Sequence, residues 1–201
     1  MKKIILASGS LRRKDLLNQL GIPFEVIESN VEEVEVDNEY SPYEWVKAIS
    51  SKKSHAVLER VEGEVVVIGA DTIVTDLGTI LHRPRNKQAG IEMMEKLQGR
   101  KHTVYTGLSI LYREADGKVK EENFVDATDV YMNKLSYEEI EAYMDTDEPY
   151  DKAGGYGIQG KGALLIESIY GDYYTVVGLP LGILYKSLKE NGINLMEFWK
   201  K

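Results

Sequence analysis

The segment from residue 65 to residue 74 reads Val-Val-Val-Ile-Gly-Ala-Asp-Thr-Ile-Val and is the most hydrophobic part of the chain. It lacks the alternation of apolar and polar side chains that marks a half-exposed strand, so we expect a strand buried on both faces. Such strands lie at the centre of sheets that are covered by helices. The segment therefore predicts an α/β protein built around a central sheet.

The rest of the chain supplies further strands and helices for this sheet. Apolar patterns with turn residues between them predict strands at residues 4–6, 24–27, 80–82, 102–112, 119–132 and 162–169. Start signals and apolar faces predict helices that begin near residues 10, 41, 86, 136 and 180. Because no repeat, low-complexity tract or linker interrupts this order, we predict a single domain over residues 1–201.

Composition excludes several classes of protein. The 201 residues include no cysteine, which excludes disulfides and thiolate chemistry, and the three histidines lack the spacing of a structural zinc site. No apolar run approaches the roughly 20 residues that cross a bilayer, and the one at the N-terminus is too short for a signal peptide. We therefore expect a cytoplasmic protein with no membrane partner. The formal net charge of −8 argues against binding of nucleic-acid polymers, which need a basic face.

The stretch Leu6-Ala7-Ser8-Gly9-Ser10-Leu11-Arg12-Arg13 joins the first strand to the first helix through a loop of small and hydroxyl residues. Ser10 is well placed to cap the helix. The two arginines fall in the first helical turn, where the helix dipole is already positive. Either they are solvated surface residues, or an anion bound at the free backbone N–H groups compensates their charge. We favour an anion site because the small-residue loop, the hydroxyl side chains and the two positive charges are all features that bind anions.

Two charged residues fall inside apolar patterns. Asp71 interrupts the central strand, where a carboxylate does not stay charged and unpaired. It either binds local N–H groups or lies where the strand opens into a cleft, paired with a cation or metal. We favour the second interpretation because Gly69 and Ala70 leave room for close approach. Lys52 falls on the predicted apolar face of the helix that starts at Ser41, and either extends to water or reaches into a pocket.

A glycine-rich segment, Glu-Pro-Tyr-Asp-Lys-Ala-Gly-Gly-Tyr-Gly-Ile-Gln-Gly, runs from residue 148 to residue 160. It combines four glycines with acidic, basic and amide side chains. Flexible surface loops are seldom so rich in tyrosine and so poor in serine. We interpret the segment as a loop that wraps closely around a ligand.

Five blocks of the sequence resemble the signature blocks of the Maf family, in the family's order and almost from end to end. They are Leu6–Arg13, Gly69–Thr72, His102–Gly107, Asp151–Gly160 and Val176–Leu181. The family comprises nucleoside triphosphate pyrophosphatases, which cleave a nucleotide to its monophosphate and pyrophosphate with a divalent metal. The resemblance implies a fold like that of inosine triphosphate pyrophosphatase, with a long mixed sheet, flanking helices and two lobes around a cleft, usually as a homodimer.

The resemblance also implies roles for individual residues. Asp71 matches the family's catalytic aspartate, a proton acceptor, while Arg12, Thr72 and Gln159 match positions tied to substrate choice. Other polar positions that line the family's site correspond to Ser8, Arg13, Glu33, Lys52, Asp151 and Lys152. The expected cations around the triphosphate are Arg12, Arg13, Lys52, Lys152 and Arg83.

A divalent metal is expected as the cofactor. Mg²⁺ and Mn²⁺ favour oxygen ligands, and Glu33 and Asp71 are the carboxylates expected to hold one of them, with Asp151 as a third candidate. Metal binding would lower the proton affinity of Asp71, so either the carboxylate or, in part, the metal activates the attacking water. Two residues depart from the family pattern: Leu11 replaces a usual proline, and Arg83 replaces a common lysine.

The order Asp-Lys-Ala-Gly and then Ile-Gln-Gly resembles the branch of the family that acts on dTTP and UTP. The amide of Gln159 offers one donor and one acceptor, which complement O4 and N3–H of uracil or thymine. We therefore expect dTTP, UTP or a modified pyrimidine nucleotide as substrate. The alternatives are a 7-methyl-GTP pyrophosphatase, whose branch has glutamate at this position, and a nucleotide-binding regulator of septum formation. A sugar-phosphate nucleotidyltransferase is a third, but its longer glycine-rich signature is missing.

Overall fold

The computed structural model describes residues 2–31 and 40–199. Within them, seven strands form one sheet in the order β2-β1-β3-β5-β6-β7, with β4 paired to β3. Their bounds are β1 (Lys3–Leu6), β2 (Glu25–Val26), β3 (Val65–Asp76), β4 (Thr79–Leu81), β5 (Lys101–Arg113), β6 (Val119–Met132) and β7 (Ile166–Tyr170). β1 pairs in parallel with β2 and β3, whereas β4 and β7 pair antiparallel with their neighbours. The expected long mixed sheet is confirmed.

The central strand is β3, as its sequence predicts. All of its residues are buried except Thr72 and Asp76, which are half-buried. Its first half pairs with β1, from Lys3 opposite Val65 to Leu6 opposite Ile68. Burial on both faces explains why the segment is almost continuously apolar.

The chain divides into two compact units. The first comprises Met1–Asp71, Thr106–Val125 and Gly178–Lys201, and the second comprises Thr72–Tyr105 and Asp126–Val177. Strands β3, β5 and β6 contribute residues to both units, and the boundary on β3 falls between Asp71 and Thr72.

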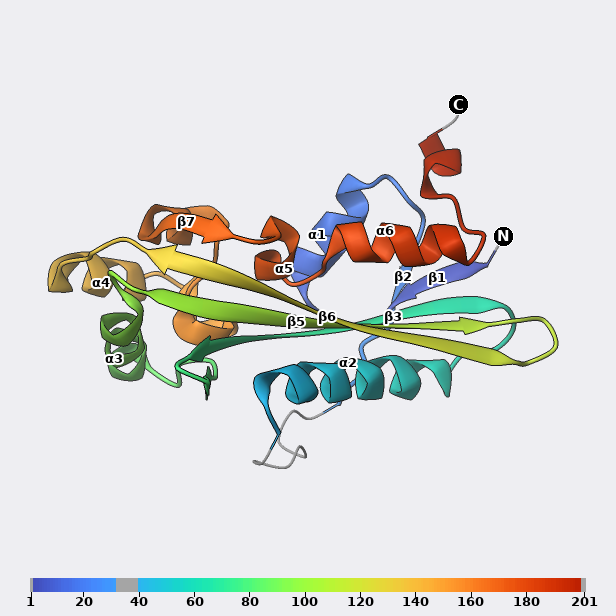
Figure 1. The fold of residues 1–201 in the computed structure, drawn as a ribbon, viewed down its shortest axis with the longest axis horizontal. Coiled ribbons are helices and arrows are strands. Elements are labelled where there is room, and N and C mark those ends of the chain that lie inside the picture. Colours follow the sequence, from blue (N-terminus) through green and yellow to red (C-terminus); the bar gives the residue numbers. More distant parts are fainter. Residues whose placement is uncertain (1, 32–39, 200–201) are drawn as a thin grey trace. The chain divides into compact units, whose positions relative to one another are not determined.

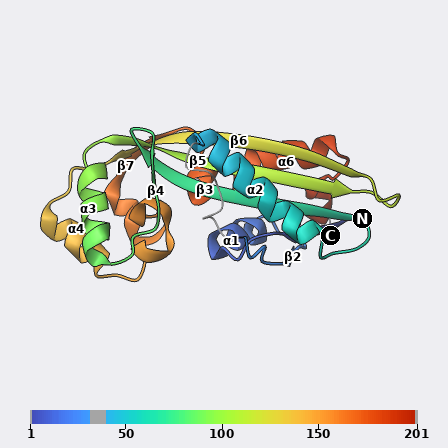
Figure 2. The ribbon, with the colours of Figure 1, turned by 90° about the horizontal axis from the view of Figure 1, so that it is seen from below.

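In the first unit, helices cover both faces of the sheet. Helix α2 (Pro42–Leu58) lies on one face, and α1 (Leu11–Gln19) and α6 (Leu181–Glu190) lie on the other (Figures 1 and 2). The short 3-10 helix η5 (Leu195–Trp199) follows α6. Helix α2, with 17 residues, is the longest of the described helices, and none of these is both long and apolar enough to span a bilayer.

In the second unit, α3 (Lys87–Leu97) and α4 (Tyr137–Met144) pack side by side (Figure 2). Their apolar side chains join those of the strands in one core, which includes Met94, Val104, Ile140 and Tyr156. The chain then forms three short 3-10 helices, η2 (Pro149–Asp151), η3 (Ala153–Gly155) and η4 (Gly160–Leu165), and a short helix α5 (Tyr173–Val177).

The helix starts follow the local sequence signals. Ser41 and Ser136 each form a complete capping box with a glutamate three residues later, and the Asn86 side chain accepts a hydrogen bond from the N–H of Ala89. Ser10 occupies the N-cap of α1, but its side chain makes no capping hydrogen bond. The strand predicted at 162–169 is wrong in its first half: η4 occupies residues 160–165, and β7 begins at Ile166. Helix α5 is not among the predicted elements.

Two glycines allow α2 to approach the sheet closely. A Cβ atom added to Gly107 on β5 would lie 2.1 Å from the carbonyl oxygen of Val46, and one added to Gly69 on β3 would lie 2.4 Å from that of Ser50. These are backbone atoms, so a side chain at either glycine would force the helix away from the strands.

Gly107→Ala should therefore destabilise the protein by about 1–3 kcal/mol, as measured by urea unfolding, because the added methyl overpacks this contact. Gly182→Ala in α6 is the matched control, since no atom lies within 4 Å of the Cβ position there. That control should be neutral or stabilising by up to about 1 kcal/mol, because alanine is the better helix former. Equal stability of Gly107→Ala and the wild type would contradict the packing argument.

Candidate active site

The first unit holds a buried ion pair between α2 and β3. The ammonium Nζ of Lys53 lies 2.6 Å from Oδ1 of Asp71, and the two residues are 8% and 4% exposed. Asp71 is thus paired with a cation, as expected from its place in an apolar strand. At this distance the pair is a charge-assisted hydrogen bond, which orients the carboxylate.

The cation beside Asp71 is Lys53. The sequence pattern left that cation unnamed and placed the neighbouring Lys52 on the apolar face of the helix. Lys52 is exposed, so its predicted place on the apolar face of α2 is wrong. The buried face consists of Trp45, Val46, Ile49, Ser50, Lys53, Ser54, Val57 and Leu58. Two serines belong to this face, and Ser54 Oγ lies 2.7 Å from Ser109 Oγ. Counting small hydroxyl residues with the apolar ones would have identified Lys53.

Arg13 fastens the loop that follows β1. Its side chain is only 9% exposed; Nη1 donates to Ser8 Oγ at 3.0 Å, and Nε donates to the carbonyl oxygen of Gly178 at 2.7 Å. Ser8 Oγ also accepts from the N–H of Ser10 at 3.2 Å. Arg13 therefore joins this loop to the segment before α6, a structural role that its position in the first turn did not predict. Arg12 is half-buried.

The loop and Asp71 lie at the same end of the parallel strands. The N–H of Ala7, just after β1, donates to the carbonyl oxygen of Ile68 on β3 at 2.8 Å. Ser8 is the next residue of the first segment, and Asp71 lies three residues beyond Ile68 on β3. The carboxyl ends of parallel strands commonly carry ligand sites. The first unit thus places Ser8 and the Lys53–Asp71 ion pair just beyond the point at which β1 and β3 stop pairing.

The remaining predicted site residues that the structure describes belong to the second unit. Thr72 is half-buried on β3, and Arg83 is exposed just before the buried Pro84. Gln159 is half-buried and directly precedes η4. Asp151 and Lys152 lie together on the glycine-rich segment, with 2.7 Å between Lys152 Nζ and Asp151 Oδ1. Glu33 lies outside the described residues.

Glycines shape this segment where atoms approach closely. Gly154 has a φ of +73°, which favours glycine, and a Cβ there would lie 2.9 Å from the side chain of Val74. A Cβ at Gly157 would lie 2.8 Å from Cε of Lys152. The segment is therefore folded tightly on itself and against β3.

A buried histidine anchors the segment to the sheet. His102 on β5 is 3% exposed, and its Nε2 lies 2.5 Å from the hydroxyl of Tyr156, with the two rings edge to face. Burial lowers the pKa of His102 to about 4, so the ring is neutral at pH 7. Both residues belong to blocks that the sequence marked out, but their contact could not be predicted from spacing.

Of Glu33 and Asp71, the two main carboxylates expected to hold a metal, the described residues include only Asp71. Mg²⁺ needs only one or two protein carboxylates when phosphate oxygens and waters complete its shell. Asp71 can supply one, although its Oδ1 also contacts Lys53. Within residues 2–31 and 40–199, no group of three or more histidine or acidic side chains could hold an ion. The described residues therefore fit a cation that takes one ligand from Asp71 and its other ligands from phosphate oxygens and waters.

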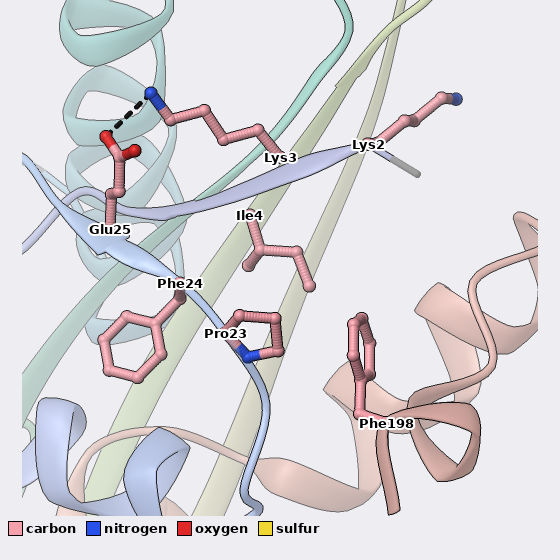
Figure 3. A pocket seen from close by; sticks show the side chains of 7 residues that line it. All are labelled: Lys2, Lys3, Ile4, Pro23, Phe24, Glu25 and Phe198. Carbon is pink, nitrogen blue, oxygen red and sulfur yellow. Dashed lines mark ion pairs between the residues drawn. The ribbon is translucent and has the colours of Figure 1, made fainter. Parts of the chain in front are cut away.

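A separate pocket of about 270 Å³ lies at the opposite end of β1 (Figure 3). It is lined by Lys2, Lys3, Ile4, Pro23, Phe24, Glu25 and Phe198. Lys3 is paired with Glu25 at 2.7 Å, and Lys2 is paired with Glu114. Since no predicted site residue lines it, this pocket is distinct from the candidate active site.

Residues 3–191 match the family described as Maf-like protein. The chain belongs to the Maf family. Two curated relatives of this Maf-family protein are each named dTTP/UTP pyrophosphatase, one from Bacillus anthracis and one from Bacillus thuringiensis subsp. konkukian. Each is 46% identical over 97% of this chain and 98% of its own length.

Among solved structures, the Staphylococcus aureus Ham1 protein aligns with 94% of this chain and 100% of its own, at 16% identity and a TM-score of 0.47. The family membership expected from the five sequence blocks is confirmed by the family match and by the curated relatives.

Lys53→Met should destabilise this Maf-family protein by about 3–5 kcal/mol, because it leaves the buried Asp71 carboxylate without its partner. Lys52→Met is the control, since it removes the same charge one residue away on the exposed face. Its effect on urea unfolding should stay within about 0.5 kcal/mol. Equal losses of stability in the two variants would contradict the assignment of the ion pair.

His102 should make stability depend on pH. Because its pKa falls from 6.5 to about 4 on folding, the unfolded chain binds a proton first, and stability is lost as the pH falls through this range. The loss from pH 8 to pH 5 should be about 2 kcal/mol. In His102→Asn this contribution should vanish, so urea unfolding at the two pH values should give a smaller difference than in the wild type. Parallel pH profiles would show that the histidine does not titrate as inferred.

Proposed function

We propose that this Maf-family protein is a nucleoside triphosphate pyrophosphatase that hydrolyses dTTP and UTP to the monophosphate and pyrophosphate. The substrate is supported by the 46% identity, over almost the full length of both chains, to relatives of that name. The geometry that carries the proposal is the buried Asp71 carboxylate, oriented by Lys53 at the edge of the sheet where the loop into α1 begins.

In this reaction, water attacks the α-phosphorus, and the bond from that phosphorus to the oxygen bridging to the β-phosphorus breaks. The oxygen of the water stays on the monophosphate, and pyrophosphate leaves. Asp71 accepts a proton from the attacking water, and Lys53 fixes the direction in which the carboxylate points. The short contact with Lys53 orients the carboxylate before the substrate binds, which reduces the cost of orienting it during the reaction.

The rest of the proposed site binds the triphosphate and the base. Ser8 and the cationic side chains contact phosphate oxygens; the cations are Arg12, Arg13, Lys52, Arg83 and Lys152. Gln159 pairs with the pyrimidine edge, while Thr72 and Arg12 contribute to substrate choice. Asp151 holds the Lys152 ammonium, to which it is already paired.

The proposal includes a divalent cation, Mg²⁺ or Mn²⁺. Asp71 and Glu33 would hold it, and when bound it would neutralise charge on the phosphate oxygens. We further propose that the protein acts as a homodimer in the cytoplasm.

A panel of nucleoside triphosphates with Mg²⁺ or Mn²⁺, read by pyrophosphate release, tests the function. We expect turnover of dTTP and UTP, with little turnover of purine nucleotides. Asp71→Asn should lower kcat by about 10²–10⁴-fold while nucleotide binding is retained, because the variant lacks the proton acceptor. Absence of dTTP and UTP turnover by folded protein would refute the substrate, and normal turnover by Asp71→Asn would refute the mechanism.

A further inference from the structure

One carboxylate closes the glycine-rich segment. Glu148 lies directly before η2, and its side chain accepts hydrogen bonds from the N–H groups of Lys161 and Gly162, each at 2.9 Å. The hydroxyl of Tyr143 donates to the same carboxylate at 3.2 Å. A single side chain therefore joins the two ends of the loop formed by residues 149–160.

Glu148 also holds the interior of the loop through its backbone. Its carbonyl oxygen accepts a hydrogen bond from Lys152 Nζ at 2.5 Å. Lys152 in turn lies across Gly157, where an added Cβ would come within 2.8 Å of Cε. The start, the middle and the end of the loop are thus all connected to one residue.

The far end of the loop has no room for another arrangement. Gly160 has a φ of +67°, and a Cβ there would lie 2.7 Å from Oε2 of Glu148. A Cβ at Gly162 would lie 2.2 Å from the carbonyl oxygen of Gly157. Because a carboxylate that accepts three hydrogen bonds does not move aside freely, the backbone of residues 160–162 is fixed against it.

The charged form of Glu148 is the one that the loop binds. Although burial opposes ionisation, the N–H groups of Gly162 and Lys161 and the hydroxyl of Tyr143 hold the pKa of this carboxyl below its usual range. All these groups donate, and a carboxylate is purely an acceptor. A neutral amide at this position would turn one donor-to-acceptor contact into a contact between two donors.

We propose that Glu148 is a positioning residue for base selection: by fixing the backbone that directly follows Gln159, it sets where the Gln159 amide meets the base. This inference rests on the proposed function. A glutamine amide selects one base only when its position and orientation are fixed. If the amide can flip, its oxygen and its NH₂ group exchange places, and it pairs equally well with uracil, thymine or cytosine. Glu148 supplies the fixed place without touching the substrate.

The test compares Glu148→Gln with Asp147→Asn, which removes the same charge at the neighbouring exposed residue. For each folded protein, kcat/KM is measured for dTTP, UTP and CTP. Glu148→Gln should lower the ratio of dTTP to CTP by about tenfold, the effect of one lost hydrogen bond to a charged group. Asp147→Asn should keep the wild-type ratio. A residue that only stabilised the fold would lower all three values alike, and that result would overturn the proposal.

Limited proteolysis gives a readout that does not depend on the substrate. Trypsin cleaves after lysine, and Lys152 and Lys161 both lie in the segment that Glu148 holds. Glu148→Gln should be cut faster at these two sites than the wild type and Asp147→Asn, with other sites unchanged. Equal cleavage in the three proteins would overturn the proposal even if the ratio of activities changed.

The activity ratios and the cleavage rates together distinguish a failure of the proposed function from a failure of the role of Glu148. Absence of dTTP and UTP turnover in the wild type would overturn the proposed function and the role in base selection, while the cleavage rates would still decide whether Glu148 holds the loop. If Glu148→Gln does not fold, Tyr143→Phe removes one of the three donors and leaves both backbone contacts. It should shift both readouts in the same direction by a smaller amount, and no shift in either would overturn the proposal.

Discussion

The close contact between α2 and the sheet is the constraint on which the site of the first unit depends. The backbone of the helix can lie against β3 and β5 only because Gly69 and Gly107 present no side chain to it. At this separation the four-carbon stem of Lys53 reaches Asp71 while both residues stay buried. The packing of a helix on two glycines thereby determines which lysine meets the carboxylate. The orientation of the proposed catalytic group is a consequence of backbone packing.

Much of the fold could be predicted because its signals are local. The capping serines, the asparagine at residue 86 and the apolar run of β3 act through neighbours in sequence, and each has the predicted structure. The apolar run after Gly162 was ambiguous, since a short run of this kind does not distinguish a helical turn from a strand. The chain forms the 3-10 helix η4 there, and a Cβ added to Gly162 within it would lie 2.2 Å from the carbonyl oxygen of Gly157.

The site could be predicted only in part, because its residues depend on contacts distant in sequence. Asp71 was evident as a charge in a buried strand. Lys53 depended on the rotation of α2, which differs by one residue from the predicted face. Arg13 binds the carbonyl of Gly178, which is 165 residues away, and Glu148 closes a loop whose length gave no sign of where it closes. The residue types indicated phosphate chemistry, but the contacts between these residues are determined by packing and could not be read from the sequence.

The Ser8 hydroxyl has a consequence for the ligands that this loop can accept. Its oxygen receives hydrogen bonds from Arg13 Nη1 and from the N–H of Ser10, which together match its two lone pairs. The hydroxyl proton is then the only part of the group left for a further hydrogen bond. Ser8 can therefore act toward a ligand only as a donor. A molecule that meets this side chain must bring a lone pair, so an ammonium or amide N–H is rejected where a phosphoryl oxygen is accepted.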